Sequence, residues 1–287
     1  MRLAYFPFLI SFSMAQDMQV RYVSSYSFDA KWFGEIEIIL DQIRAPGYYR
    51  SNTKYSPKKW MFRWYYSEDG SIEIAGTDNK LGYNAKSKKY WIEPQENYKV
   101  TNEEETKSES QRNKMNGEKF LYNWLTLFNE NIFEGDQNRP LIERLMSDSM
   151  ENINGFRATK WTTTISTEEN KMVIEEWIVE KLPLKDSFYS YHIGLDTKEI
   201  SSISSNDFIK DIDSTSTIEA IDGDIVKAEL VIESDNAWVK SMKFEIRELY
   251  TVPFDALSFA IPEDYERVDE PSRSWLGQNE PEKNKID

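Results

Sequence analysis

The sequence predicts an α+β fold: a curved antiparallel sheet, or unclosed β-barrel, with a helical insertion covering its concave face. On both sides of residues 117–153, apolar side chains alternate with polar ones, which is typical of half-buried strands. Within those limits, apolar residues recur every four positions, as on one face of a helix: Phe120, Trp124, Phe128 and Ile132. That helix face needs a partner to bury it, and the sheet is the available one.

Composition limits the kinds of protein that this chain represents. Its 287 residues are 39% hydrophobic and 30% charged, which suits one large domain with a sizeable core and excludes wholesale disorder. The absence of Cys excludes disulfides, thiolate metal sites and Cys nucleophiles, and a single His excludes multi-His metal sites. A formal charge of −15 excludes a fold-wide basic surface for nucleic acid.

The N-terminus has the pattern of a signal peptide over residues 1–15. Arg2 precedes an uncharged apolar stretch, and Ser13-Met14-Ala15 supplies small residues for cleavage after Ala15. Cleavage there predicts a periplasmic or secreted protein; the alternative is a buried N-terminal strand. Charges interrupt every later apolar run, so we expect no transmembrane segment in the mature chain.

The predicted domain spans residues 16–269. We expect its first half to be an antiparallel meander. Ile36 and Ile38 alternate with glutamates, and residues 60–66 alternate in the same way. Asp69-Gly70 predicts a hairpin turn before the next strand. The polar stretch 101–116 is interpreted as an exposed connection.

The second half begins with the helical insertion. Its second helix is expected to begin near Pro140, to carry apolar residues as far as Met150, and to end at Asn154-Gly155. Strand patterns then follow over 159–165, 172–179, 225–233 and 238–250, and the polar tail 270–287 is expected to be disordered.

Charge is uneven along the chain, with a net of +3 over residues 1–100 and −18 over the remainder. A solvated acidic surface explains this distribution. The alternative is a local basic face toward an anionic partner, made of Lys54, Lys58, Lys59, Arg63, Lys80, Lys86, Lys88 and Lys89.

Several segments resemble the periplasmic lipoprotein-carrier (LolA-like) proteins and related uncharacterised exported bacterial proteins. Residues 56–64, SPKKWMFRW, resemble the family's basic-Pro-x-x-Phe-x-Trp strand, and residues 72–84 its following hairpin. Residues 258–268 resemble the ending of the exported relatives, and 154–177 their paired strands. The family has Arg where this chain has Ser56, so the latch of its helical lid is not reproduced.

The resemblance implies an unclosed barrel whose apolar cavity takes up acyl chains. Aromatic side chains give such a cavity large contact areas with few rotatable bonds. The candidate ligand-binding residues are therefore Trp60, Phe62, Trp64, Tyr83 and Trp91 on the sheet, with Trp124 and Phe128 on the helix. The same alternation also fits an ordinary filled core.

Other chemistry has weaker support in the sequence. His192 lies near no catalytic pattern, so it is a structural residue or, alternatively, a general base. Asp211, Asp213, Asp222 and Asp224 match a calcium loop incompletely and otherwise fit solvated turns. Glu175 and Glu176 beside Trp177 are the best pair for a carboxylate hydrolase.

These observations together predict an exported binding or carrier protein rather than an enzyme. Its expected partner is a lipid or a lipid-modified protein, with lipoprotein trafficking and outer-membrane biogenesis as the specific case, and no cofactor or metal is expected. The alternative is a non-catalytic structural or protein-interaction module of the cell envelope.

Overall fold

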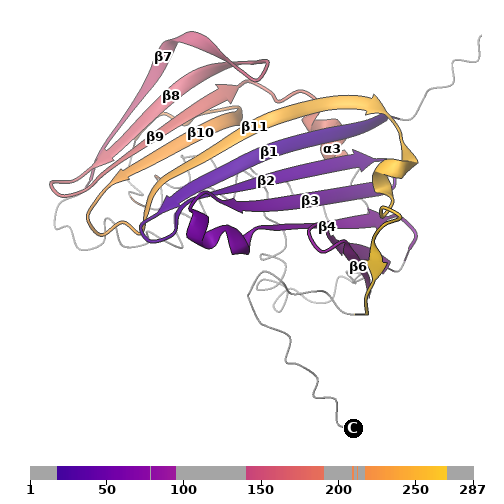
Figure 1. Cartoon of the computed structure of the whole chain (residues 1–287). Coiled ribbons are helices and arrows are strands. Elements are labelled where there is room, and N and C mark those ends of the chain that lie inside the picture. Colours follow the sequence, from indigo (N-terminus) through magenta and orange to yellow (C-terminus); the bar gives the residue numbers. More distant parts are fainter. Residues whose placement is uncertain are drawn as a thin grey trace, which may run out of the picture.

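The computed structural model describes residues 18–77, 79–94, 140–190, 209, 212 and 217–269. Within these ranges the chain is almost all β, and its strands form one large unclosed sheet (Figure 1). The strands of the first half are β1 (Met18–Ala30), β2 (Gly34–Ala45), β3 (Tyr48–Pro57), β4 (Ser67–Ile74), β5 (Asn79–Asn84) and β6 (Lys89–Pro94). Those of the second half are β7 (Leu141–Ile153), β8 (Phe156–Ser166), β9 (Lys171–Val179), β10 (Asp224–Glu233), β11 (Val239–Pro253) and β12 (Glu266–Arg267). The helical elements are η1 (Trp60–Tyr65), α3 (Lys185–Ser190) and η2 (Ala256–Phe259).

The strand order is β12-β6-β5-β4-β3-β2-β1-β11-β10-β9-β8-β7, so two meanders meet at the β1–β11 pair. β1 pairs antiparallel with β11 along its whole length, from Met18 opposite Pro253 to Ala30 opposite Val239. The parallel pair is that of β12 with β6, at one edge of the sheet. The centre of the sheet is therefore a seam between residues more than two hundred positions apart.

The main core lies on one face, which we call the inner face. Along each strand the side chains alternate between the two faces, and the register brings the apolar ones together. Tyr26 lies beside Ile38 on one side and Phe244 on the other, with the Tyr26 and Phe244 ring centroids 5.2 Å apart. Across β11 to β8 the same face carries further buried side chains, namely Met242, Ile246, Ala228, Leu230, Ile174, Met172 and Ile165.

A second, smaller core lies on the opposite, outer face, over β2 to β6. Its buried members are Ala45, Ile72 and Tyr83 from the sheet and Phe259 from η2. The C-terminal segment 254–267, which we call the strap, crosses this end of the sheet and finishes as β12 beside β6 (Figure 1). Phe259 packs against Tyr48, with ring centroids 5.2 Å apart.

The predicted α+β class is wrong. Residues 141–153, where the second inserted helix was expected, form the edge strand β7, and Asn154-Gly155 is its hairpin turn to β8. The apolar spacing of Leu141, Leu145 and Met146 fits a helix, but the segment hydrogen-bonds to β8 and exposes these side chains at the sheet edge. The described residues contain no helical insertion; the predicted helix with Trp124 and Phe128 lies outside them.

Two local predictions in the first meander are also wrong. Residues 60–65 form the 3-10 helix η1 instead of a strand, and Asp69-Gly70 lies inside β4 instead of forming a turn. Gly70 is opposite Tyr83, and a Cβ atom on it would lie 2.2 Å from the Tyr83 ring. Glycine here makes room for an aromatic ring across the strand, which is a recognised use of glycine in sheets.

The described residues include no helix that is both long enough and apolar enough to cross a membrane. The predicted signal peptide, the stretch 101–116, His192 and the tail 270–287 lie outside the described residues.

Candidate functional site

The inner face of the sheet carries the larger of the two buried apolar clusters in the described part of the chain. Over β11, β10 and β9 its side chains are aliphatic or aromatic and buried. Described residues that pack with it from outside the strands include Leu182, Ile209, Ile212 and Ile221. One carboxylate interrupts it: Glu176, which is opposite Ala228 and only 1% exposed.

The inner face becomes polar toward β3 and β4. Gln42 and Arg44 point to the same face of β2 as Ile38 does. The Gln42 amide and the Arg44 guanidinium both lie near Tyr49 on β3. The Gln42 amide donates to the Tyr49 hydroxyl at 3.1 Å, and Arg44 stacks 4.9 Å from the Tyr49 ring centroid. The face is thus amphipathic, with a buried cation at the boundary between its apolar and polar parts.

Arg44 is held from two directions. Its Nη1 donates to the Phe188 carbonyl of α3 at 3.1 Å, and its guanidinium lies 3.9 Å from the Phe188 ring centroid. The Phe188 ring in turn lies 5.4 Å from that of Tyr22 on β1. Arginine suits this position because its planar group stacks on rings while it donates hydrogen bonds.

Burial shifts the ionisation of two groups beside Arg44. Loss of solvation raises the pKa of the Tyr49 hydroxyl, an effect that the charge of Arg44 partly opposes. Loss of solvation likewise raises the pKa of Glu73, which is opposite Tyr49 on β4. Arg44 itself is 6% exposed, so its charge is enclosed beside these two groups.

The structure does not bring together the four predicted ligand-binding residues whose side chains it describes. Trp60 and Phe62 lie on η1 at the end of the sheet, and Trp60 is 79% exposed. Tyr83 faces outward beneath the strap, whereas Trp91 is buried on the other face, opposite Gly82. Of Trp64 only the backbone is described, and Trp124 and Phe128 lie outside the described residues.

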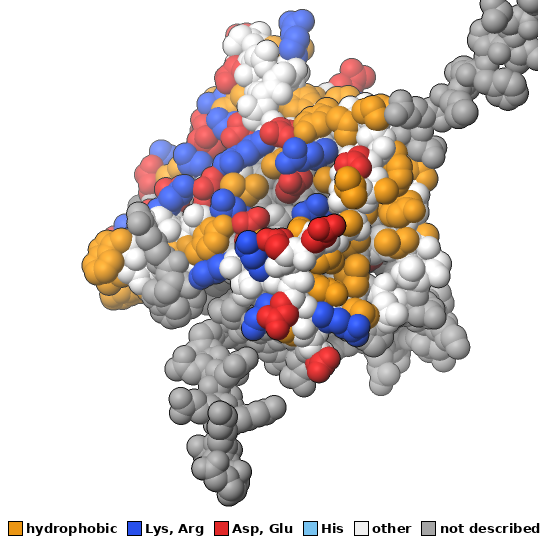
Figure 2. Space-filling view, turned by 45° about the vertical axis from the view of Figure 1, so that its right-hand side comes forward, with side chains coloured by type: hydrophobic (Ala, Val, Ile, Leu, Met, Phe, Trp, Pro, Cys, Tyr) orange, Lys and Arg blue, Asp and Glu red, His pale blue; other side chains and the backbone are white. Residues whose placement is uncertain are grey.

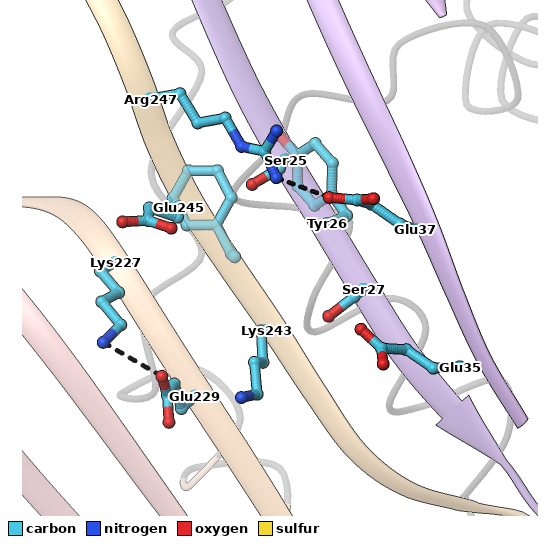
Figure 3. A pocket seen from close by; sticks show the side chains of 11 residues that line it. Ser25, Tyr26, Ser27, Glu35, Glu37, Lys227, Glu229, Lys243, Glu245 and Arg247 are labelled. Carbon is cyan, nitrogen blue, oxygen red and sulfur yellow. Dashed lines mark hydrogen bonds and ion pairs between the residues drawn. The ribbon is translucent and has the colours of Figure 1, made fainter. Parts of the chain in front are cut away.

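The outer face carries a groove of about 200 Å³ across β10, β11, β1 and β2 (Figure 3). Its walls are charged, with side chains of both signs pointing into it: Glu35, Glu37, Lys227, Glu229, Lys243, Glu245 and Arg247. Figure 2 shows the same mixture of blue and red side chains across the outer face. The groove is therefore lined by charged side chains, whereas the inner face over β11, β10 and β9 is apolar.

Ion pairs neutralise much of this groove. Arg247 and Lys58 both bond the Glu37 carboxylate, at 2.6 and 2.7 Å, and Lys227 pairs with Glu229 at 3.0 Å. The hydrogen bonds from Lys58 and Arg247 lower the pKa of Glu37, against the opposing effect of burial. Glu37 is thus a paired structural anion, with two cations on its oxygens.

Glu175 and Glu176 do not form a catalytic pair. They are neighbours in β9, so their side chains leave opposite faces of the sheet. Glu175 pairs with Lys160 on the outer face at 2.7 Å, whereas Glu176 is buried on the inner face. Two carboxylates on opposite faces cannot act on one glycosidic bond.

Within the described ranges no group of three or more acidic or His side chains has the geometry of a metal site. Asp224, from the incomplete calcium pattern, instead accepts from the Leu182 backbone at 2.7 Å and pairs with Lys185. It thereby ties the start of α3 to β10. Asp211 and Asp213 lie outside the described residues.

The predicted basic face is dispersed among other interactions. Lys58 pairs with Glu37 and Lys88 pairs with Asp264 of the strap, each at 2.7 Å. Lys54 and Lys86 both lie near the Tyr66 ring.

The sequence analysis overlooked Arg44, the buried charge of the inner face. Arg44 shares the alternation of Ile36, Ile38 and Leu40 and therefore points to the same face. A charged residue in the same alternation as three apolar residues was the signal that could have predicted a buried charge.

Comparison with known proteins leaves the family open. No protein-family model matches the chain, and no curated protein matches it. Among solved structures, a DUF1329 family protein from Desulfovibrio piger ATCC 29098 is similar at 10% identity and a TM-score of 0.24. The match covers 84% of this chain and 89% of that one, but a similarity this low supports no conclusion about function.

Proposed function

We propose that this chain is an exported, non-catalytic binding protein for an amphipathic ligand, which lies along the inner face of the sheet. The observation that carries the proposal is the change along this face from the buried apolar side chains of β11, β10 and β9 to the buried Arg44. A tail along β11, β10 and β9 gains about 0.8 kcal/mol for each methylene removed from water. An anionic head group near Arg44 gains a charge-assisted hydrogen bond.

The arrangement of the charges supports binding rather than catalysis. Of the carboxylates in the outer groove, Glu37 and Glu229 have cations on their oxygens, and Glu176 lies across the sheet from Glu175. The predicted signal peptide and the carrier-like segments agree with export and with a role in moving lipids or lipid-modified proteins.

The first test is whether the purified protein binds an acyl chain. After delipidation, the chain is titrated with a dansyl-labelled fatty acid, whose emission rises in an apolar site. Ala228→Phe enlarges a buried side chain at the centre of the inner face. Thr164→Phe, on the outer face of β8, is the matched control.

We expect the wild type and Thr164→Phe to bind the probe, and Ala228→Phe to bind it at least about tenfold more weakly with little change in melting temperature. A filled core predicts something else: no probe binding by the wild type, and a cost of about 1–3 kcal/mol for Ala228→Phe from overpacking. That result would overturn the proposal.

The head-group assignment is tested separately at Arg44. Arg44→Met keeps an unbranched apolar stem but removes the charge, so affinity for the fatty-acid anion should fall while affinity for its methyl ester stays the same. Native mass spectrometry of the protein taken from the exported fraction identifies the amphiphile that co-purifies. Equal losses for the anion and the ester would contradict the role of Arg44.

A protein-interaction module is the second candidate, and the edge strand β7 favours it. Leu141, Leu145 and Met150 are exposed there, on a strand whose other side pairs with β8. Edges of this kind add strands from other chains. If this reading holds, Leu145→Lys reduces concentration-dependent association in sedimentation, and the chain binds no lipid.

A further inference from the structure

Glu73 on β4 is a carboxylate that the described residues leave without a bonded partner. It is half-buried on the inner face, opposite Tyr49, and it forms no hydrogen bond or ion pair with any residue that the structure describes. Glu68 in the same strand is also half-buried, but it accepts from the Asn52 amide at 3.0 Å and from the Tyr66 hydroxyl at 2.8 Å. Burial of Glu73 therefore costs solvation that no protein donor restores.

The charged groups around Glu73 do not compensate for its burial. Loss of solvation raises its pKa above the ordinary 4.5, although the charges of Lys80 and Arg44 act in the opposite direction. Lys80, on β5, lies opposite Glu93 of β6 and forms no ion pair with either carboxylate in the described part of the chain. Asp69, the other carboxylate of β4 on this face, already accepts from a side-chain amide at 2.6 Å. The carboxylate of Glu73 is thus available to a donor from outside the protein.

Glu73 and Arg44 lie on either side of Tyr49 in one cross-strand row of the inner face. The register places Arg44 opposite Tyr49 and Tyr49 opposite Glu73, so the two charged residues are two strands, or about 10 Å, apart at the backbone. The Arg44 guanidinium lies 4.9 Å from the Tyr49 ring centroid, which places it toward the strand between them. Arg44 and Glu73 form no ion pair with each other. The row therefore presents a cation and a carboxylate on one face, separated by an aromatic ring.

We infer that the amphiphile of the inner face has a zwitterionic head group, with its anion at Arg44 and an ammonium group at Glu73. The inference rests on the proposed function, because it names the chemical class of the ligand at the same site. An ammonium group supplies the charge and the donors that Glu73 lacks, and hydrogen bonds between charged groups are roughly twice as strong as neutral ones. A head group that is only anionic would instead bring a like charge toward Glu73. Phosphoethanolamine head groups have the required arrangement, with an ammonium on a short carbon arm beside the phosphate.

The test compares two lysophospholipids that have the same acyl chain. Lysophosphatidylethanolamine carries the ammonium, whereas lysophosphatidylglycerol keeps the phosphate and has hydroxyls in its place. Each lipid, below its critical micelle concentration, displaces the dansyl-labelled fatty acid from the delipidated protein. Glu73→Gln removes the charge and keeps the shape of the side chain. Glu35→Gln is the matched control, because it removes the same charge from an exposed position in the groove of the outer face.

We expect the wild type and Glu35→Gln to bind the ethanolamine lipid at least about tenfold more tightly than the glycerol lipid. Glu73→Gln should lose most of this preference through weaker binding of the ethanolamine lipid, with no loss of affinity for the fatty acid. Because burial opposes the ionisation of Glu73, the variant should melt at the same or a higher temperature than the wild type at about pH 7.

Equal binding of the two lipids by the wild type, or equal losses for both in Glu73→Gln, would overturn the inference while the fatty-acid result stands. A structural pair of Glu73 with Lys80 would also overturn it, and predicts a lower melting temperature for Glu73→Gln with an unchanged lipid preference. If the wild type binds neither the fatty acid nor either lipid, the inner-face proposal itself fails, and this inference fails with it.

Discussion

Gly70 is the residue on which the packing of Tyr83 depends. A Cβ at this position would lie 2.2 Å from the Tyr83 ring and 2.5 Å from the Ser51 carbonyl oxygen, which is backbone and cannot move aside. Gly70→Ala should therefore lower the free energy of unfolding by about 1–3 kcal/mol, measured by urea denaturation. Ser71→Ala, the next residue in β4, should cost less than half as much. Equal effects of the two changes would contradict this explanation.

Glu37 makes stability depend on pH. Its folded pKa lies below the ordinary value of 4.5 because Lys58 and Arg247 bond the carboxylate. A lowered folded pKa means that the ionised carboxylate stabilises the fold above about pH 4.5, and that this contribution is lost as pH falls through the folded pKa.

Glu37→Gln should accordingly reduce stability at about pH 7 and have little effect at about pH 3, as measured by urea unfolding at each pH. Glu180→Gln, at an exposed position after β9, is the control and should change neither. A loss of the same size at both pH values would show that Glu37 acts through its shape and not its charge.

Individual residues explain why some local predictions succeeded. Ile36 and Ile38 alternate with glutamates and do lie in β2, because period-two alternation is specific to strands. Gly70 follows Asp69 in a pattern typical of turns, yet it lies within a strand because Tyr83 needs the space. The sequence contains Tyr83 but not its position opposite Gly70, so this long-range reason was not predictable.

Among the elements, the strap closes the outer core and holds one edge of the sheet. The Arg50 guanidinium donates to the Ser258 carbonyl at 3.0 Å, and Lys88 pairs with Asp264. The backbone N–H of Glu266 donates to the Lys88 carbonyl at 2.8 Å, so β12 covers β6. The strap therefore does for this edge what a paired strand does, and leaves β7 as the more open one.

Removing the anchor of the strap should open this edge. Phe259→Ala deletes a ring that is buried against Tyr48 and Phe254, and should cost about 3–5 kcal/mol in urea unfolding. Leu257→Ala, in the same short helix but exposed, should cost under about 0.5 kcal/mol. A strap that contributes nothing to the fold would make the two variants equal.

The strand β7 shows the limit of periodicity for elements. Apolar residues at 141, 142, 145, 146 and 150 fit one face of a helix, and Pro140 fits its first turn. In the sheet, an edge strand with both faces partly open accepts the same residues in no strict alternation, and a bulge between Met146 and Met150 shifts the register further. Pairing with β8 makes this segment a strand, and the pattern within one segment does not show which other segment it pairs with. Alternation likewise does not show which aromatic residues share a site: Trp60, Tyr83 and Trp91 belong to different faces and ends of the sheet.

For the whole molecule, the seam between β1 and β11 joins the two meanders. If the chain is cut within residues 101–116 and both pieces are co-expressed, they should remain associated through this seam, which is checked by size-exclusion chromatography in native buffer. A second piece that ends after Ser234 lacks β11 and should not capture the first. Separation of the intact pieces would mean that the seam contributes little.

The seam also affects when the chain can fold relative to its synthesis. Phe244 and Ile246 complete the main core and Phe259 completes the outer one, so neither interior exists until almost all of the polypeptide has been synthesised. The nascent chain is therefore expected to leave the ribosome before either core is complete. Under the proposed export, such a chain would not have to be unfolded before it enters a translocation channel.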